Sequence, residues 1–227
     1  MADEDEDHDR KALIAGAELT LAGAAVALVS LSAAHCVALE KVAAEFAAKV
    51  ADYPHSFVPL TPLEVSAYVA AALEQRARGE RYPFALQLDG TIVGSTSYFL
   101  FFWSWPEHSP PGARREPDAV EIGATWIAPS VQRSRCNTEA KLLLLAHAFE
   151  VWRVHRVSLK TDERNLRSRN AIERIGARFD GILRGDMPGR DASVRNSAYY
   201  SIVAGEWPAV KSGLTAMLAK YGRPQKV

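Results

Sequence analysis

An Asp-Gly pair near the middle of the chain limits the possible folds more than any other feature of the sequence. Asp89 and Gly90 separate two apolar runs, residues 82–88 and 91–103. A two-residue turn of this composition joins neighbouring antiparallel strands, because both positions tolerate a positive φ. The sequence therefore predicts an antiparallel hairpin within a sheet.

A second unit of the predicted fold has parallel strands. A strand at 120–128, a helix at 138–152 and a strand at 154–161 follow one another, and such a crossover helix joins parallel strands. Thr61 and Glu64 have the spacing of a capping box at a helix start. Apolar periodicity predicts the other elements, which are strands at 26–31, 178–184 and 198–203 and helices at 33–50, 62–78, 165–175 and 207–221. The expected class is α/β (α+β), with a mixed, mostly antiparallel central sheet of about seven strands and flanking helices.

The balanced charge of the chain conceals an acidic first segment. The chain has 227 residues, with 27 Lys plus Arg and 27 Asp plus Glu. Six of the acidic residues lie within the first nine positions, so the rest of the chain has an excess of six positive charges. Such a run of like charges is typical of a solvated tail. We expect residues 1–17 to form a disordered acidic tail, residues 18–206 to form one domain, and residues 207–227 to form a C-terminal helix and tail.

Nucleic acid, a membrane and a metal are not expected partners. A nucleic-acid-binding protein usually has a basic excess, which the net charge of zero does not provide. The uncharged stretch 19–34 has 16 residues, fewer than the roughly 18–20 that span a bilayer. Cys36 and Cys136 lack metal-ligand spacing, so we expect free thiols, no metal and a cytoplasmic protein.

A polar turn between the predicted strand 120–128 and the following helix is the best candidate for a binding site. The first backbone N–H groups of a helix have no internal partner and favour an anion. Arg133 and Arg135 add cationic donors suited to phosphate, and residues 130–190 hold 13 Lys or Arg against 7 Asp or Glu. Two interpretations stay open, a phosphate cradle and a basic turn without a ligand.

This turn resembles the acetyl-CoA loop of the Gcn5-related N-acetyltransferases (GNAT family). It is most similar to the branch that contains the ribosomal-protein N-terminal acetyltransferases. The matching loop residues are Gln132, Arg133, Asn137, Thr138, Glu139, Ala140 and Lys141. A second motif matches too, with Asn165 and Ser168 before a helix that ends at Gly176. The resemblance covers about residues 18–215 and makes residues 18–206 a GNAT-like domain.

The loop departs from the family pattern at one position. Arg135 stands where the family has Gly, which would let the backbone approach a pyrophosphate without a Cβ. The Arg135 side chain either points outward and adds a phosphate contact, or it crowds the loop and weakens cofactor binding.

The resemblance implies an acetyl-CoA-dependent N-acetyltransferase. The acetyl group would be transferred by direct attack of a primary amine, which belongs to a protein N-terminus or a small molecule. A homodimer is compatible with the resemblance. The alternative is a non-catalytic acyl-CoA-binding or regulatory module. The residues expected to bind acetyl-CoA are Trp126, Ile127, Gln132, Arg133, Ser134, Arg135, Cys136, Asn137, Thr138, Asn165 and Ser168.

The family also suggests roles in catalysis. The fourth expected strand, 120–128, should carry a bulge and part from the next strand, and a backbone N–H at Trp126 or Ile127 would steady the oxyanion. Glu121 is the candidate base, or else an ordinary carboxylate at a strand edge. Ser168 is the candidate proton donor to the thiolate, or else a helix cap.

The remaining candidates concern the cofactor and the acceptor. Asn165 is expected to bind the cofactor, with a turn residue as the alternative. Trp103 and Trp105, with the Pro-rich loop at 104–118, are expected to line the acceptor pocket. Histidine His147 is expected to be structural rather than catalytic.

Overall fold

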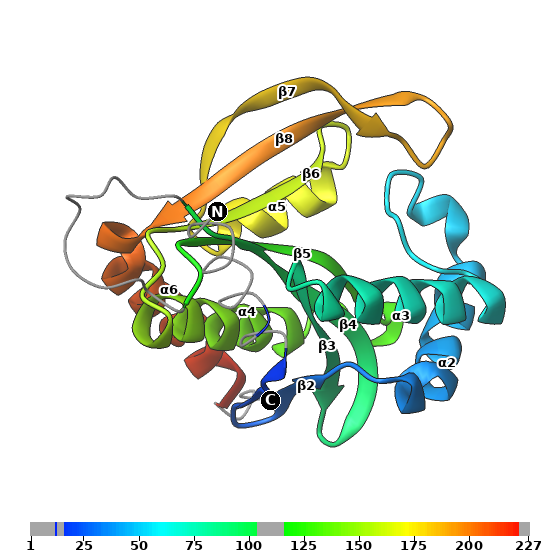
Figure 1. The fold of residues 1–227 in the computed structure, drawn as a ribbon, viewed down its shortest axis with the longest axis horizontal. Coiled ribbons are helices and arrows are strands. Elements are labelled where there is room, and N and C mark those ends of the chain that lie inside the picture. The colour runs from blue at the N-terminus through cyan, green and yellow to red at the C-terminus, as the bar shows by residue number, and fades with distance from the viewer. Residues whose placement is uncertain (1–11, 13–15, 104–115, 223–227) are drawn as a thin grey trace, which may run out of the picture.

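The computed structural model describes Ala12, residues 16–103 and residues 116–222. Its centre is one eight-stranded sheet in the order β1-β2-β3-β4-β5-β6-β8-β7 (Figure 1). Every neighbouring pair is antiparallel except β5 and β6. The strands are β1 Thr20–Ala22, β2 Val26–Ser30, β3 Arg81–Leu88, β4 Thr91–Phe101, β5 Ala119–Ile127, β6 Arg156–Asp162, β7 Arg178–Pro188 and β8 Val194–Val203. The mixed, mostly antiparallel sheet is confirmed, with one strand more than expected.

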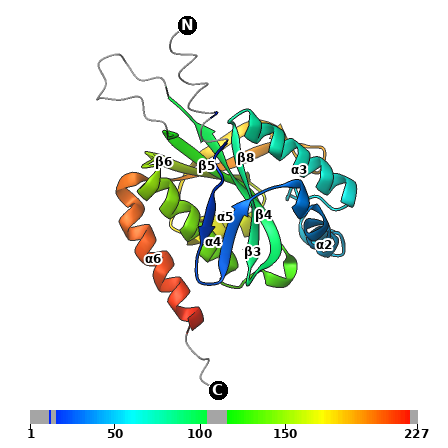
Figure 2. The same cartoon turned by 60° about the horizontal axis from the view of Figure 1, so that its bottom comes forward.

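Helices cover both faces of this sheet. They are α2 Cys36–Ala47, α3 Pro62–Ala77, α4 Cys136–Ala146, α5 Leu166–Arg174 and α6 Trp207–Ala219. Figure 2 shows α2 and α3 together on one side of the strands and α4 with α6 on the other. Tyr98 of β4 marks the second face, since its hydroxyl donates to the carbonyl of Leu144 on α4 at 2.5 Å.

The local signals in the sequence explain where several elements begin. Asp89 and Gly90 have φ values of 49° and 78°, as a tight hairpin turn requires, and they join β3 to β4. The Thr61 side chain accepts the Glu64 N–H at 3.2 Å and caps α3. The reciprocal bond of the capping box differs, because the Glu64 carboxylate accepts from Leu60 N–H, one residue earlier.

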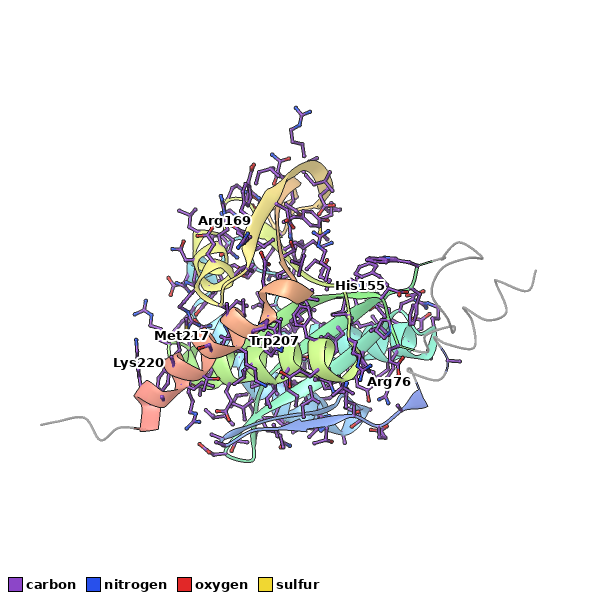
Figure 3. All side chains as sticks on the ribbon, turned by 90° about the vertical axis from the view of Figure 1, so that its left-hand side faces the viewer. Arg76, His155, Arg169, Trp207, Met217 and Lys220 are labelled. Atoms are coloured by element: carbon purple, nitrogen blue, oxygen red, sulfur yellow. The ribbon has the colours of Figure 1, made fainter. Side chains whose placement is uncertain are left out.

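The last helix packs against the end of α4. The chain leaves α4 through a π-helical turn at His147–Val151. Trp207 at the start of α6 is labelled in Figure 3. Its Nε1 donates to the Glu150 carboxylate at 2.8 Å, and its ring stacks on Phe149 with ring centroids 5.5 Å apart. This packing fixes the C-terminal end of α4 and so its direction across the sheet. Within residues 16–103 and 116–222, no helix has the length and apolar character to cross a membrane.

Candidate active site

The strands β5 and β6 part after a short parallel ladder. Only three pairs join them, from Ala119 with Arg156 to Glu121 with Ser158. From residue 122 onward the β6 side of β5 has no strand partner along the described sheet. The result is a notch lined by one edge of β5, next to the start of α4.

A bulge in β5 turns this edge toward the notch. Ser95 of β4 pairs with Trp126, whereas Ser97 pairs with Gly123, so β5 has one extra residue between them. Ala124 has a φ of 47°, which absorbs the extra length. Ala124 and Thr125 are exposed, although the rest of β5 is largely buried. The bulge and the parting expected for this strand are both present.

The alternation of the strand identifies one amide that faces the notch. Ala128 N–H donates to Val93 O of β4 at 2.8 Å, so the peptide groups of Ile127 point to the opposite edge. In agreement, the Ile127 carbonyl accepts from Gln132 Nε2 at 3.0 Å. The N–H of Ile127, and not that of Trp126, is therefore directed at the notch.

The loop before α4 is held by its own polar side chains. Gln132 spans from Ile127 to the Tyr53 hydroxyl, which donates to Gln132 Oε1 at 3.0 Å. Ser134 Oγ donates to Val131 O at 2.7 Å and accepts the Cys136 N–H at 3.2 Å. Arg133 is exposed with a φ of 63°. These hydrogen bonds fix the shape of the loop, and the first amides of α4 follow it directly.

Arg135 does not need the conformational freedom of the Gly that it replaces. Its φ and ψ are −63° and −20°, in the ordinary helical region. Its Nε donates to Glu139 Oε2 at 2.8 Å, and the Glu139 side chain is only 4% exposed. The other oxygen of Glu139 accepts the Ala25 N–H at 3.0 Å, in the turn between β1 and β2. The Arg135 side chain therefore lies along α4 and leaves the loop uncrowded.

Glu121 lies where the two strands part and is 7% exposed. Burial raises the pKa of its carboxyl, and the nearby Lys160 ammonium partly offsets that rise. Lys160 Nζ is 3.5 Å from Glu121 Oε2 and also donates to the Tyr199 hydroxyl at 3.4 Å. A Cβ at Gly123 would come within 2.9 Å of Glu121 Oε1. The absent side chain at Gly123 leaves the room that this carboxylate occupies.

Asn165 and Ser168 have different places at the start of α5. Asn165 Oδ1 accepts the Ser168 N–H at 3.1 Å and is the N-cap of the helix. Asn165 Nδ2 donates to Ser56 Oγ at 3.3 Å. The alternative of Ser168 as the cap is thus wrong, since Asn165 fills that role.

Several other predicted residues have buried structural positions. Trp126 is 3% exposed and packs edge-on against Phe46 and Tyr68. Thr138 is fully buried and accepts from Arg174 at 3.1 Å. Burial raises the pKa of Cys136 to about 12, which disfavours a thiolate nucleophile.

The predicted acceptor residues are described only in part. Trp103 is 42% exposed and stacks on His155, with ring centroids 5.6 Å apart. Trp105 lies outside the described residues. Burial lowers the pKa of His147 to about 4, and its ring packs edge-on against Trp152.

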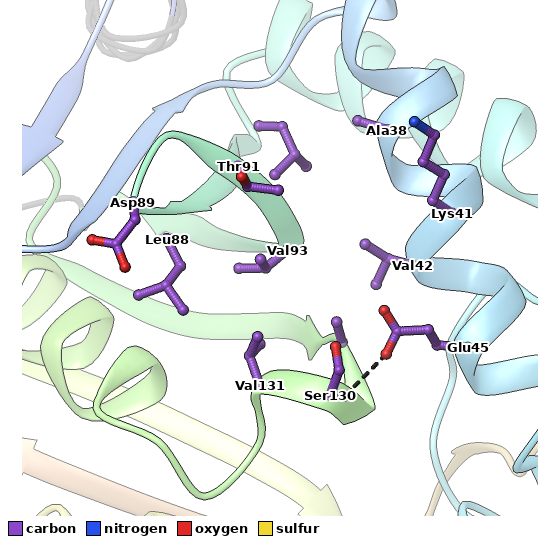
Figure 4. Close-up of a pocket in the computed structure, with 12 residues that line it drawn as sticks. Ala38, Lys41, Val42, Glu45, Leu88, Asp89, Thr91, Val93, Ser130 and Val131 are labelled. Carbon is purple, nitrogen blue, oxygen red and sulfur yellow. Dashed lines mark hydrogen bonds between the residues drawn. The ribbon is translucent and has the colours of Figure 1, made fainter.

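A cavity of about 440 Å³ lies away from Glu121, between α2 and the turn of the β3–β4 hairpin (Figure 4). Its rim includes Ser130, whose N–H donates to Glu45 of α2 at 2.9 Å. Val42 and Val93 make its walls largely apolar. The cavity therefore adjoins the start of the loop but shares no described residue with the notch.

Sequence reasoning missed four residues of the site. Tyr53, Lys160, Thr125 and Lys141 had no assigned role, although Lys141 belongs to the loop motif and Lys160 begins the segment of the second motif. Their contacts join different elements: Tyr53 reaches Gln132 across 79 positions, and Lys141 of α4 reaches Thr125 of β5 across 16. No local spacing could have indicated these contacts.

The comparisons with known proteins agree on one family. A family model described as an acetyltransferase (GNAT) domain matches residues 27–178. YnaD, an uncharacterized N-acetyltransferase of Bacillus subtilis (strain 168), is 24% identical over 129 residues, which are 56% of this chain and 66% of that protein. The match thus spans slightly less than two thirds of that relative's length.

Two solved structures extend the likeness over most of the fold. A GCN5-related N-acetyltransferase from Brucella melitensis is 26% identical with a TM-score of 0.74, covering 91% of this chain and 88% of that one. Mycobacterium smegmatis RimJ, solved in complex with CoA-disulfide, is 21% identical with a TM-score of 0.67. That match covers 89% of this chain and 93% of RimJ and concerns the fold alone.

Proposed function

The chain belongs to the GNAT acetyltransferase family, and we propose that it transfers an acetyl group from acetyl-CoA to a primary amine by direct attack. One observation carries this proposal: the notch between β5 and β6 opens beside the start of α4, with the buried Glu121 at its base. Acetyl-CoA supplies an activated acyl group with a thiol leaving group. The residues of this chain hold it, take up a proton and stabilise charge.

The loop and the first amides of α4 are suited to the phosphates of the cofactor. The dipole of α4 favours an anion at its N-terminus. Arg133 is exposed, and Arg135 directs only its Nε to Glu139, which leaves the two terminal nitrogens of its guanidinium for a phosphate. Asn137 and Thr138 belong to the first turn, ahead of the first i to i−4 bond from Glu139 N–H. We assign this segment to the pyrophosphate.

We assign the chemistry to three groups of this chain. An ammonium must lose a proton before attack, and Glu121, with its raised pKa, accepts that proton directly or through a water. The Ile127 N–H then donates to the oxyanion that forms at the attacked carbonyl. Ser168, whose hydroxyl does not cap α5, returns a proton to the departing thiolate.

The acceptor is a primary amine on a protein N-terminus or a small molecule. Glu121, Lys160 and Tyr199 lie together at the base of the notch, and the negative charge of Glu121 favours a cationic amine near it. RimJ, whose structure was solved with CoA-disulfide, and RimL, described as a ribosomal L7/L12 alpha-N-protein acetyltransferase, share this fold. Peptide N-termini are therefore the first acceptors to test.

The deciding experiment measures thiol release from acetyl-CoA in the presence of a panel of N-terminal peptides and small amines. We expect release that needs both the enzyme and an acceptor, and that falls sharply in Glu121→Gln. Stabilisation by CoA without release on any acceptor would instead support the acyl-CoA-binding module. No shift in melting temperature with CoA or acetyl-CoA would contradict both functions.

A further inference from the structure

A buried lysine lies behind the notch without an acidic partner. Lys141 on α4 is 6% exposed, and it makes no salt bridge to any carboxylate of the described residues. Burial lowers the pKa of its amine to about 7. A buried cation without a counter-charge costs free energy of folding, so its position calls for a functional explanation.

Among the residues that the structure describes, this amine has one hydrogen-bond partner, a residue of the bulge. Lys141 Nζ donates to Thr125 Oγ1 at 2.9 Å. Thr125 Oγ1 also lies 2.7 Å from Thr96 Oγ1 of β4. Thr96 is fully buried, whereas Thr125 is exposed in the part of β5 that has left β6. The three groups thus lead from the interior beside α4 to the surface of the notch.

The donors and acceptors of this cluster determine which further hydrogen bond Thr125 can make. In its protonated form, below its pKa of about 7, Lys141 only donates, so the Thr125 oxygen accepts from it. Thr96 can supply a second donor to the same oxygen, which leaves the single hydrogen of Thr125 free to point into the notch. Lys141 polarises this hydroxyl and makes it a better donor. A carbonyl oxygen in the notch would complete the arrangement.

We propose that the Thr125 hydroxyl, oriented by Lys141, donates a hydrogen bond to a carbonyl oxygen of the acyl-CoA arm. This inference rests on the proposed function and deepens it, because it names a contact between the bulge and the arm that passes it. Amide carbonyls of the arm and the thioester carbonyl share this chemistry. Lys141 is then a positioning residue, which acts through Thr125.

The test is a pair of affinities, for CoA and for acetyl-CoA, measured by calorimetry on wild type and Thr125→Val. Loss of one hydrogen bond should weaken binding by about tenfold. Equal loss for both ligands assigns the contact to an amide, and loss for acetyl-CoA alone assigns it to the thioester. Thr125→Ser keeps the hydroxyl and should bind within about twofold of wild type.

Thr96→Val is the matched control, since it removes the buried partner of the same hydroxyl. It should lower the melting temperature as Thr125→Val does, and its affinities should stay within about threefold of wild type. Lys141→Met should weaken binding in the wild-type background and add little in the Thr125→Val background, because the two residues act as one unit.

Two results would overturn the inference. If Thr125→Val binds both ligands as Thr96→Val does, Thr125 has only a structural role while the proposed function stands. If wild type binds neither ligand, the proposed function fails and the contact fails with it. Both results come from binding alone, so they do not depend on knowing the acceptor.

Discussion

Lys160 Nζ lies 3.5 Å from Glu121 Oε2, at the point where β5 and β6 part. Two effects on the Glu121 pKa oppose one another: burial raises it and the Lys160 ammonium lowers it. The carboxylate therefore stays available as a base while remaining more basic than an exposed glutamate. This balance leads to the first two predictions.

Glu121→Gln should lower kcat by about 100-fold, within the range for loss of a general base. The affinity for CoA should stay within about twofold, because the amide has the size of the carboxyl group. Rates measured from pH 5 to 9 should also lose their acidic limb. An acidic limb that persists unchanged in this variant would remove Glu121 from the mechanism.

Lys160→Met should move the acidic limb of the rate profile to higher pH. The ammonium lowers the Glu121 pKa, so its removal leaves the carboxyl protonated at higher pH and shifts the onset of activity upward. The same pH series checks this, with Glu121→Gln as the background in which the substitution should produce no shift. A shift to lower pH would mean that Lys160 does not act on Glu121.

Arg135→Met should lower the free energy of unfolding by about 2 kcal/mol, because the Glu139 carboxylate would be left buried with one partner fewer. Arg133→Met is the control for stability, since Arg133 is exposed, and it should change the free energy of unfolding by less than about 0.5 kcal/mol. Urea unfolding of the three proteins measures the difference. Equal stability of the two variants would contradict a structural role for the Arg135–Glu139 pair.

The stability of the protein should rise with pH above neutrality because of Lys141. Its folded pKa of about 7 is below the usual lysine pKa of 10.5, so between these values the unfolded state binds more protons and the folded state becomes more stable as pH rises. From pH 6 to 9 wild type should gain about 2 kcal/mol over Lys141→Met. Denaturant titrations at four pH values give this difference, and parallel curves would mean that Lys141 titrates normally.

His147 should make the stability of the protein depend on pH in the acidic range. Its folded pKa of about 4 is below the usual histidine pKa of 6.5, so the unfolded state binds more protons in this interval and stability falls as pH falls from 6.5 to 4. Wild type should lose about 2 kcal/mol more than His147→Leu over this range. Thermal unfolding at pH 4.5, 5.5 and 7 distinguishes this from acid unfolding that does not involve the residue.

The parts of the fold that the sequence predicted are those with a local cause. Asp89 and Gly90 determine a turn by their own backbone freedom, and Thr61 caps the helix that begins next to it. The strand at Thr20–Ala22 escaped notice because three residues carry no usable alternation. The later hairpin is longer than expected, since glycines at 181 and 185 interrupt the pattern of β7.

The candidate site could be predicted only where its residues are close together in the sequence. The loop, the bulge strand and Glu121 lie in one continuous segment, and the family pattern identified them together. Lys160 and Tyr53 come from other elements, and their contacts depend on tertiary packing that no spacing encodes. At Arg135 the sequence left two alternatives open, an outward side chain and a crowded loop. The structure shows the side chain along α4, where its Nε donates to Glu139.

The three-pair junction between β5 and β6 makes the sheet two half-sheets held by a short seam. Strands β1 to β5 form one half, and β6, β8 and β7 form the other. A ligand lying in the notch would touch both halves and supply, across the seam, contacts that the polypeptide itself does not make. Amide hydrogen exchange in β6 should therefore slow when the ligand binds, because the ligand would connect the two halves of the sheet.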